Sequence, residues 1–147
     1  MFYDYGGSHT SIVAANLLTG HLNDDLPSGK ELMALPLFDK TTPRDFAVFQ
    51  YNGEDKSGNP VYTLGTKSGT YGYALAALTK LMDAEERFMH VGTMPCLNNT
   101  LRIGGFLSRS LNLPFIGRPL VIIGLRKAFP KLRALVKHLQ VGRLKEI

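Results

Sequence analysis

The chain alternates between strand-like and helix-like patterns of hydrophobic residues. Aromatic residues at positions 1–5 predict a short strand, and the apolar run at 12–18 predicts a helix that ends at Gly20. Two β-type runs at 46–51 and 60–64 flank a polar, glycine-containing tip, which predicts a β-hairpin. The first half is therefore expected to form a strand, a glycine loop, a helix and a hairpin.

The second half continues the alternation. A helix is predicted over 73–86, a strand over 87–91, and then a helix that ends near residue 111. The fully apolar run 120–123 is typical of a buried parallel strand. A final helix follows, whose apolar residues share one face: Leu132, Leu135, Val136 and Leu139.

Strands that alternate with helices predict an α/β fold. We expect a three-layer arrangement, in which a mostly parallel, mixed sheet with a central β-hairpin carries helices on both faces, because parallel crossovers are right-handed. No internal repeat, low-complexity tract or linker interrupts the pattern, so residues 1–147 are expected to form a single domain.

Four segments that lead from a predicted strand into a predicted helix begin with glycine. Glycine lets the backbone approach a ligand closely, and a helix N-terminus favours anions. Because ligands of open α/β sheets bind beyond the carboxyl ends of the strands, these segments together predict a phosphate or carboxylate site. Glycine at strand ends is also common for packing alone, which is the alternative. The segments are 6–11, 65–72, 92–99 and 124–129.

The first of these loops carries the most chemistry. It occupies the place of a nucleotide P-loop, but it lacks the Walker lysine, and it has no cysteine for a phosphatase mechanism. His9 is the candidate catalytic residue, as an acid–base group or a phosphate contact; the alternative is a histidine that only organises the loop. The residues expected to bind the ligand are Gly6, Gly7 and Ser8 through backbone N–H groups, and Thr10 and Ser11 through hydroxyls.

Later loops are expected to complete this site. Lys67 and Ser68 come from the second loop, and Arg126 comes from the fourth. The histidines show no metal-ligand spacing, so no metal site is expected, and the cofactor is left open. The single Cys96 cannot form an internal disulfide, which fits a reducing cytoplasm. It is a candidate nucleophile or, more commonly for such a residue, a half-buried structural thiol.

Charge is distributed unevenly along the chain. The net charge is +5, but residues 1–100 hold seven Lys/Arg against eleven Asp/Glu, whereas residues 101–147 hold ten against one. Nucleic-acid binding by the basic third is not favoured, because aromatic residues do not interleave with the charges. The longest apolar stretch, 119–125, is too short to span a bilayer, and no secretory signal is expected.

The segment 5–15, Tyr-Gly-Gly-Ser-His-Thr-Ser-Ile-Val-Ala-Ala, resembles the N-terminus of a bacterial family known only as a domain of unknown function. The resemblance continues through 35–42 and 61–65, and it covers the second half by length and pattern. It implies a small cytoplasmic bacterial protein but no activity. Thr10 stands where the family pattern suggests serine. The signature loop that it implies comprises Gly6, Gly7, Ser8, His9 and Ser11.

Two functional hypotheses follow from the sequence. The first is a protein that binds a phosphate-bearing ligand or nucleotide at the glycine-rich loops, either as a binding protein or as an enzyme of phosphoryl transfer or hydrolysis. The second is a non-catalytic regulatory or assembly protein whose basic C-terminal third docks an acidic protein or nucleic acid. The oligomeric state and the ligand are left open.

Overall fold

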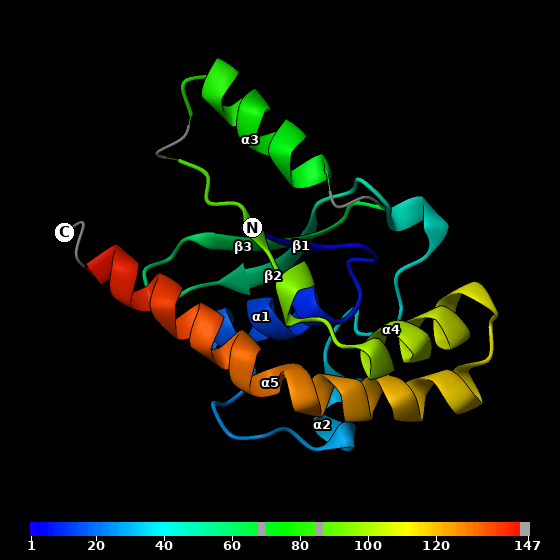
Figure 1. Ribbon diagram of the computed structural model, residues 1–147. Helices are drawn as coiled ribbons and strands as arrows, with labels where there is room; N and C mark the ends of the chain where they lie inside the picture. The colour runs from blue at the N-terminus through cyan, green and yellow to red at the C-terminus, as the bar shows by residue number, and fades with distance from the viewer. Residues whose placement is uncertain (68–69, 85–86, 145–147) are drawn as a thin grey trace.

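The computed structural model describes residues 1–67, 70–84 and 87–144, and it contains a four-stranded mixed sheet (Figure 1). The strands lie in the order β2-β3-β1-β4. The predicted α/β class and mixed sheet are confirmed, and the predicted hairpin forms one edge of the sheet. The strands are β1 (Phe2–Asp4), β2 (Gln50–Glu54), β3 (Pro60–Gly65) and β4 (Val91–Gly92).

Strand β1 lies between two parallel neighbours. Phe2 pairs with Thr63 of β3 and with Val91 of β4, while β2 pairs with β3 in the antiparallel sense. The carboxyl ends of β1, β3 and β4 therefore meet at one edge of the sheet. Three of the four predicted glycine loops leave the sheet at this edge.

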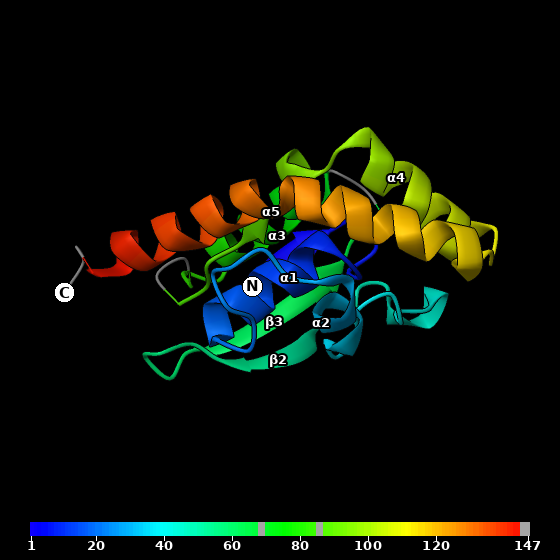
Figure 2. The same cartoon turned by 90° about the horizontal axis from the view of Figure 1, so that it is seen from below.

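Helix α1 (Thr10–Thr19) lies between the sheet and the long helix α5 (Pro114–Leu144), as Figure 2 shows. Its residues Ile12 and Val13 are completely buried, since they face neighbours on both sides. The helix ends at Gly20, whose φ of 79° is the left-handed conformation that commonly terminates helices. Every residue of α1 from Thr10 to Leu18 is buried, the polar Asn16 included, which is expected of a helix at such a central position.

Helices α4 (Asn99–Gly105) and α5 (Pro114–Leu144) pack against each other as an antiparallel pair, joined through a π-helical turn at Phe106–Ser110. Their backbones approach closely at glycines. A Cβ on Gly104 would lie 2.6 Å from the nitrogen of Val121, and one on Gly124 would lie 2.6 Å from the nitrogen of Leu101. These glycines let α4 lie directly on α5.

Helix α3 (Tyr71–Leu81) lies on the other side of the sheet from α1 and α5 (Figure 1). Its first turn approaches the sheet, because Gly72 lies against the ring of Tyr3. Beyond that turn its apolar residues are open to solvent, with Leu81 84% exposed. The predicted second helical layer is therefore not confirmed.

The short helix α2 (Gly29–Ala34) begins with a capping box between Ser28 and Glu31.

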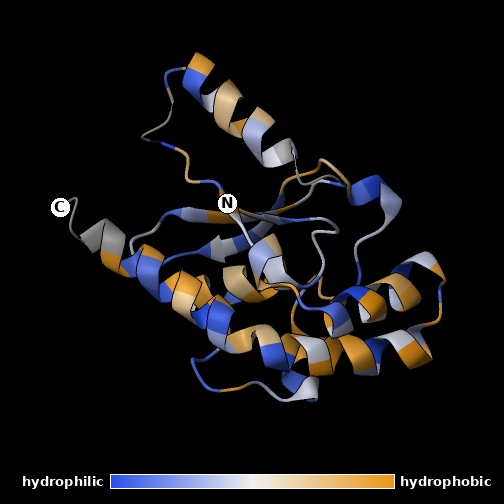
Figure 3. Cartoon of the chain, in the orientation of Figure 1, coloured by the Kyte–Doolittle hydropathy of each residue, from blue (hydrophilic) through white to orange (hydrophobic). Residues whose placement is uncertain are grey.

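The prediction of a buried strand at 120–123 is wrong, because these residues lie inside α5. The apolar run is buried on one side only: Val121 is fully buried, whereas Ile123 is 48% exposed. Figure 3 shows hydrophobic and hydrophilic positions alternating along α5. Short apolar runs do not distinguish a strand from a buried helical segment by periodicity. The fourth predicted glycine loop, 124–129, is therefore also part of α5.

Within the described residues, no helix combines the length and hydrophobicity that a bilayer crossing requires.

We expect Gly124→Ala to destabilise the protein by about 1–3 kcal/mol, since the added methyl group would overlap the backbone of Leu101. The matched control is Gly105→Ala in α4, where a Cβ would meet only the ring of His9, at 3.4 Å. This control should stay within about 1 kcal/mol of the original protein. Urea unfolding measures both. Equal stability of the two variants would contradict the close approach of α4 and α5.

Candidate functional site

The loop after β1 is organised by the buried carboxylate of Asp4. One carboxylate oxygen accepts a hydrogen bond from the backbone N–H of Gly7. The other accepts from the Thr10 hydroxyl at 2.9 Å and from the backbone N–H of Ser11 at 2.8 Å. Asp4 therefore supplies the negative charge that a helix N-terminus favours, from the end of the preceding strand.

The same loop packs closely against the end of the neighbouring strand β3. Gly7 has a φ of 63°, and a Cβ there would lie 2.6 Å from the nitrogen of Gly65 at the end of β3. The carbonyl oxygen of Asp4 accepts hydrogen bonds from the backbone N–H and the hydroxyl of Thr66, at 3.0 and 3.1 Å. Position 7 therefore requires glycine, both for its backbone angle and for its contact.

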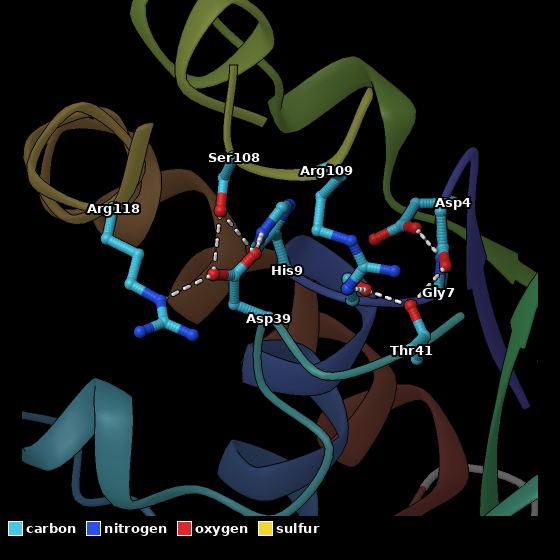
Figure 4. A network of polar contacts seen from close by, with 10 residues as sticks. Asp4, Gly7, His9, Asp39, Thr41, Ser108, Arg109 and Arg118 are labelled. Atoms are coloured by element: carbon cyan, nitrogen blue, oxygen red, sulfur yellow. Dashed lines mark hydrogen bonds and ion pairs between the residues drawn. The ribbon is translucent and has the colours of Figure 1, made fainter. Parts of the chain in front are cut away.

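His9 follows this loop as the N-cap of α1, and its Nε2 lies 3.1 Å from the carboxylate of Asp39 (Figure 4). The same carboxylate accepts hydrogen bonds from the Ser108 hydroxyl, at 2.9 Å to one oxygen, and from Nε of Arg118 at 3.0 Å. The ring of Phe38 contacts the histidine edge-on, with centroids 5.6 Å apart. The ring of His9 is therefore held on two sides.

Asp39 is an ionised group in a buried position. Burial of the carboxylate acts to raise its pKa, but hydrogen bonds from His9, Arg118 and Ser108 outweigh burial and lower the pKa to about 2. Its φ of 51° is in the left-handed region, which aspartate tolerates better than most residues. The carboxylate consequently remains negative at all physiological pH values.

A second group of contacts joins the first loop to the helical half of the molecule. Ser8 is buried, its hydroxyl is hydrogen-bonded to the hydroxyl of Thr41, and it accepts a hydrogen bond from Nη1 of Arg109 at 3.1 Å (Figure 4). Burial lowers the pKa of the Arg109 guanidinium, and the charges of Asp39 and Asp45 oppose that shift. An arginine remains charged under such a shift.

Ser8, His9 and Arg109 border a cavity of about 720 Å³ at the carboxyl edge of the sheet. Its polar wall comes from the end of β1 and the first loop, with Arg102 and Arg109 facing them from the helical half. Apolar side chains form much of the rest. The lining residues are Asp4, Tyr5, Gly6, Ser8, His9, Pro43, Phe46, Met94, Leu97, Leu101, Arg102, Gly105, Phe106, Arg109 and Ser110.

Residues of the first loop that were expected to bind a ligand occupy two different positions. Gly6, Ser8 and His9 line the cavity. Thr10 and Ser11 are fully buried, and the N–H groups of Gly7 and Ser11 are bound to Asp4. The backbone donors proposed for an anion are therefore partly occupied by a carboxylate of the protein itself.

The residues expected from the later loops do not gather with the first. Lys67 is exposed, and its Nζ lies over the ring of Phe46, 4.6 Å from the ring centroid; it is beside the cavity but does not line it. Ser68 lies outside the described residues. Arg126 lies on the exposed side of α5, so the prediction that places it in a strand-end loop is wrong. Cys96 is buried, and burial raises the pKa of its thiol, the opposite of what a nucleophile needs.

Several polar residues of the site were not found by sequence reasoning. Asp39 lies in a segment that looks like an ordinary surface loop, and Ser108 and Arg109 lie in a π-helical turn. Arg118 lies in the first turns of α5, in the Pro- and Gly-containing stretch 112–118, whose sequence is typical of a connector. The one usable signal was the second stretch of family resemblance, 35–42, which contains Asp39 and Thr41. Among the described residues, no cluster of three or more His, Cys, Asp or Glu side chains is placed to hold a metal.

Comparison with known protein families places the chain in one family. Residues 1–141 match the family described as "Protein of unknown function (DUF3189)", so the chain belongs to it. This confirms that the resemblance is to a domain-of-unknown-function family. No curated protein and no solved structure matches the chain.

We expect Asp39→Asn to remove about 2 kcal/mol of stability at neutral pH. The pKa of Asp39 is lowered from 3.8 to about 2, so its contribution is complete above pH 4 and disappears as the pH falls through 2. The original protein should lose this stability over that range, and the variant should show a flatter profile. Urea unfolding at a series of pH values measures it.

The control is Asp25→Asn, which removes the same charge from an exposed position. It should reproduce the acid profile of the original protein. A steep acid profile that persists in Asp39→Asn would show that the buried carboxylate is not the group responsible.

Proposed function

We propose that this protein binds a phosphate-bearing small molecule in the cavity between the first loop and α4. The observation that carries the proposal is the position of Arg109, whose guanidinium is partly buried at the cavity wall and uses one nitrogen, Nη1, on the Ser8 hydroxyl at 3.1 Å. Arginine forms strong, often paired hydrogen bonds with phosphate oxygens. Arg102 contributes a second positive charge to the same cavity.

The remaining walls favour a ligand with an organic body. The cavity volume of about 720 Å³ is typical of sites for small molecules. Met94, Leu97, Leu101 and Phe106 line it with apolar surface. A nucleotide, with a flat base and a charged phosphate, combines the two properties that this cavity presents.

The anion is not expected at the N-terminus of α1, as it would be in a P-loop protein. Asp4 already accepts hydrogen bonds from the N–H groups of Gly7 and Ser11. A phosphate placed there would have to displace a buried carboxylate of the same charge. We therefore propose that arginine side chains, rather than the helix terminus, neutralise the ligand.

His9 is the residue we propose to carry protons if the ligand is a substrate. Asp39 is ionised, so the Nε2–H of His9 donates to it, and in the neutral imidazole the lone pair is then on Nδ1. A Cβ on Gly105 would meet His9 at Cε1 and Nδ1, at 3.4 and 3.6 Å, so this side of the ring faces the cavity wall formed by α4. Hydrolysis of a phosphate ester, with Nδ1 taking a proton from the attacking water, is the reaction class to test.

The second hypothesis, docking of an acidic partner by the basic C-terminal third, has less support. Lys137 forms an ion pair with Asp24 at 2.7 Å, and Arg133 donates to the carbonyl oxygen of Asp24 at 3.0 Å. An acidic partner would have to compete with these contacts. A bacterial and cytoplasmic setting stays a prediction of the sequence.

We expect phenyl phosphate to bind the protein, and Arg109→Gln to weaken its affinity at least about tenfold, because a charge-assisted hydrogen bond contributes about 1.5–3 kcal/mol. Isothermal titration calorimetry measures the affinity, and circular dichroism shows whether each variant is folded. Arg109→Lys should retain part of the binding. The control is Arg126→Gln, which removes the same charge from the exposed side of α5 and should leave binding unchanged.

A failure of phenyl phosphate and adenosine 5′-monophosphate to bind the original protein would contradict the proposed function. Equal loss of affinity in Arg109→Gln and Arg126→Gln would contradict the location of the site, because it would show a response to net charge alone.

A further inference from the structure

A second, smaller pocket of about 260 Å³ adjoins the main cavity. The two share Pro43 and Arg109 in their walls, so Arg109 lies at the boundary between them. The character of the smaller pocket is different, because its walls are mainly polar. They are formed by Asp39, Lys40, Thr41, Thr42, Pro43, Ser108, Arg109, Asn112, Pro114 and Arg118.

The charges around the smaller pocket are predominantly positive. Among the wall residues, Lys40, Arg109 and Arg118 contribute three cations against the carboxylate of Asp39. One further carboxylate, that of Asp45, lies beside the wall, where it accepts hydrogen bonds from Thr42. The carboxylate of Asp39 is already bound by Arg118, His9 and Ser108, so little of its charge is left for a ligand. A pocket with these walls favours an anion.

Two of these cations, Arg118 and Lys40, have N–H donors that are available to a ligand. Arg118 uses only Nε on Asp39, and its remaining nitrogens point away from that carboxylate (Figure 4). Lys40 is exposed, and its ammonium group forms no ion pair with any residue that the structure describes. Both can donate to an incoming oxygen without breaking a contact of the fold.

We propose that the smaller pocket holds a second phosphate group of the same ligand, so that the natural ligand belongs to the class of diphosphates. This inference rests on the proposed function, since it assumes a first phosphate at Arg109. In this arrangement the guanidinium of Arg109 lies between the two groups. Lys40 and the free nitrogens of Arg118 bind the second, and the organic body occupies the apolar part of the main cavity.

The test compares inorganic phosphate with inorganic pyrophosphate by calorimetric titration of the full chain. The original protein should bind pyrophosphate at least about tenfold more tightly, which corresponds to about 1.4 kcal/mol. Lys40→Gln should reduce this preference to about threefold or less and leave the affinity for phosphate within about twofold. Arg118→Gln should act in the same direction, and circular dichroism verifies that it remains folded despite the loss of an Asp39 contact.

The control is Arg126→Gln, which should retain the full preference for pyrophosphate. Equal affinities for the two anions, or a preference that survives both Lys40→Gln and Arg118→Gln, would overturn the second phosphate site and leave the proposed function intact. A preference reduced equally by Arg126→Gln would also overturn it, as a response to net charge. If neither anion nor phenyl phosphate binds, the proposed function itself fails.

Discussion

The buried carboxylate of Asp4 is the constraint on which the site depends. It is 4% exposed, and it links the end of the central strand to the loop and to the first turn of α1 through three hydrogen bonds. A buried carboxylate without such partners would be strongly destabilising, so the loop has little freedom to adopt another path. The position of Ser8 and His9 at the cavity follows from this anchoring.

Asp4 also distinguishes the glycine-rich loop from the phosphate-binding loop of P-loop proteins. In a P-loop the helix N-terminus and the backbone donors are kept for the ligand's phosphate. Here an internal anion accepts hydrogen bonds from two of those donors, at Gly7 and Ser11. The loop therefore has the location of a P-loop, while the positive charge for a ligand comes from side chains on the other half of the chain.

The helical half supplies that charge because α4 packs closely on α5. Glycines at 104 and 124 bring the helix backbones together, and the π-helical turn that follows α4 carries Ser108 to Asp39 and Arg109 to Ser8. The basic residues of segment 101–147 that the structure describes thus lie either at the two pockets or elsewhere on α5. Arg102, Arg109 and Arg118 lie at the two pockets. Arg126, Lys127 and Lys131 lie on the exposed side of α5, and Arg133 and Lys137 bind Asp24.

Local patterns predicted the local parts of this structure. The strand at 2–4, the helix that ends at Gly20 and the hairpin were accessible because each has a clear period and a clear terminating residue. The strand expected at 120–123 was wrong because a short apolar run fits a buried helix equally well. Asp39 was missed as the partner of His9 because the two are thirty residues apart, and only the tertiary fold brings them together.

The central claim is that a phosphate group binds where Arg109 meets the first loop. The most direct test is a titration of the 15N-labelled protein with phenyl phosphate, followed by two-dimensional NMR of the backbone amides. The largest shifts are expected at Gly6, Ser8, His9, Gly105 and Arg109, which border the cavity. Shifts confined to the outer side of α5, at residues such as Arg126 and Lys131, would contradict the claim.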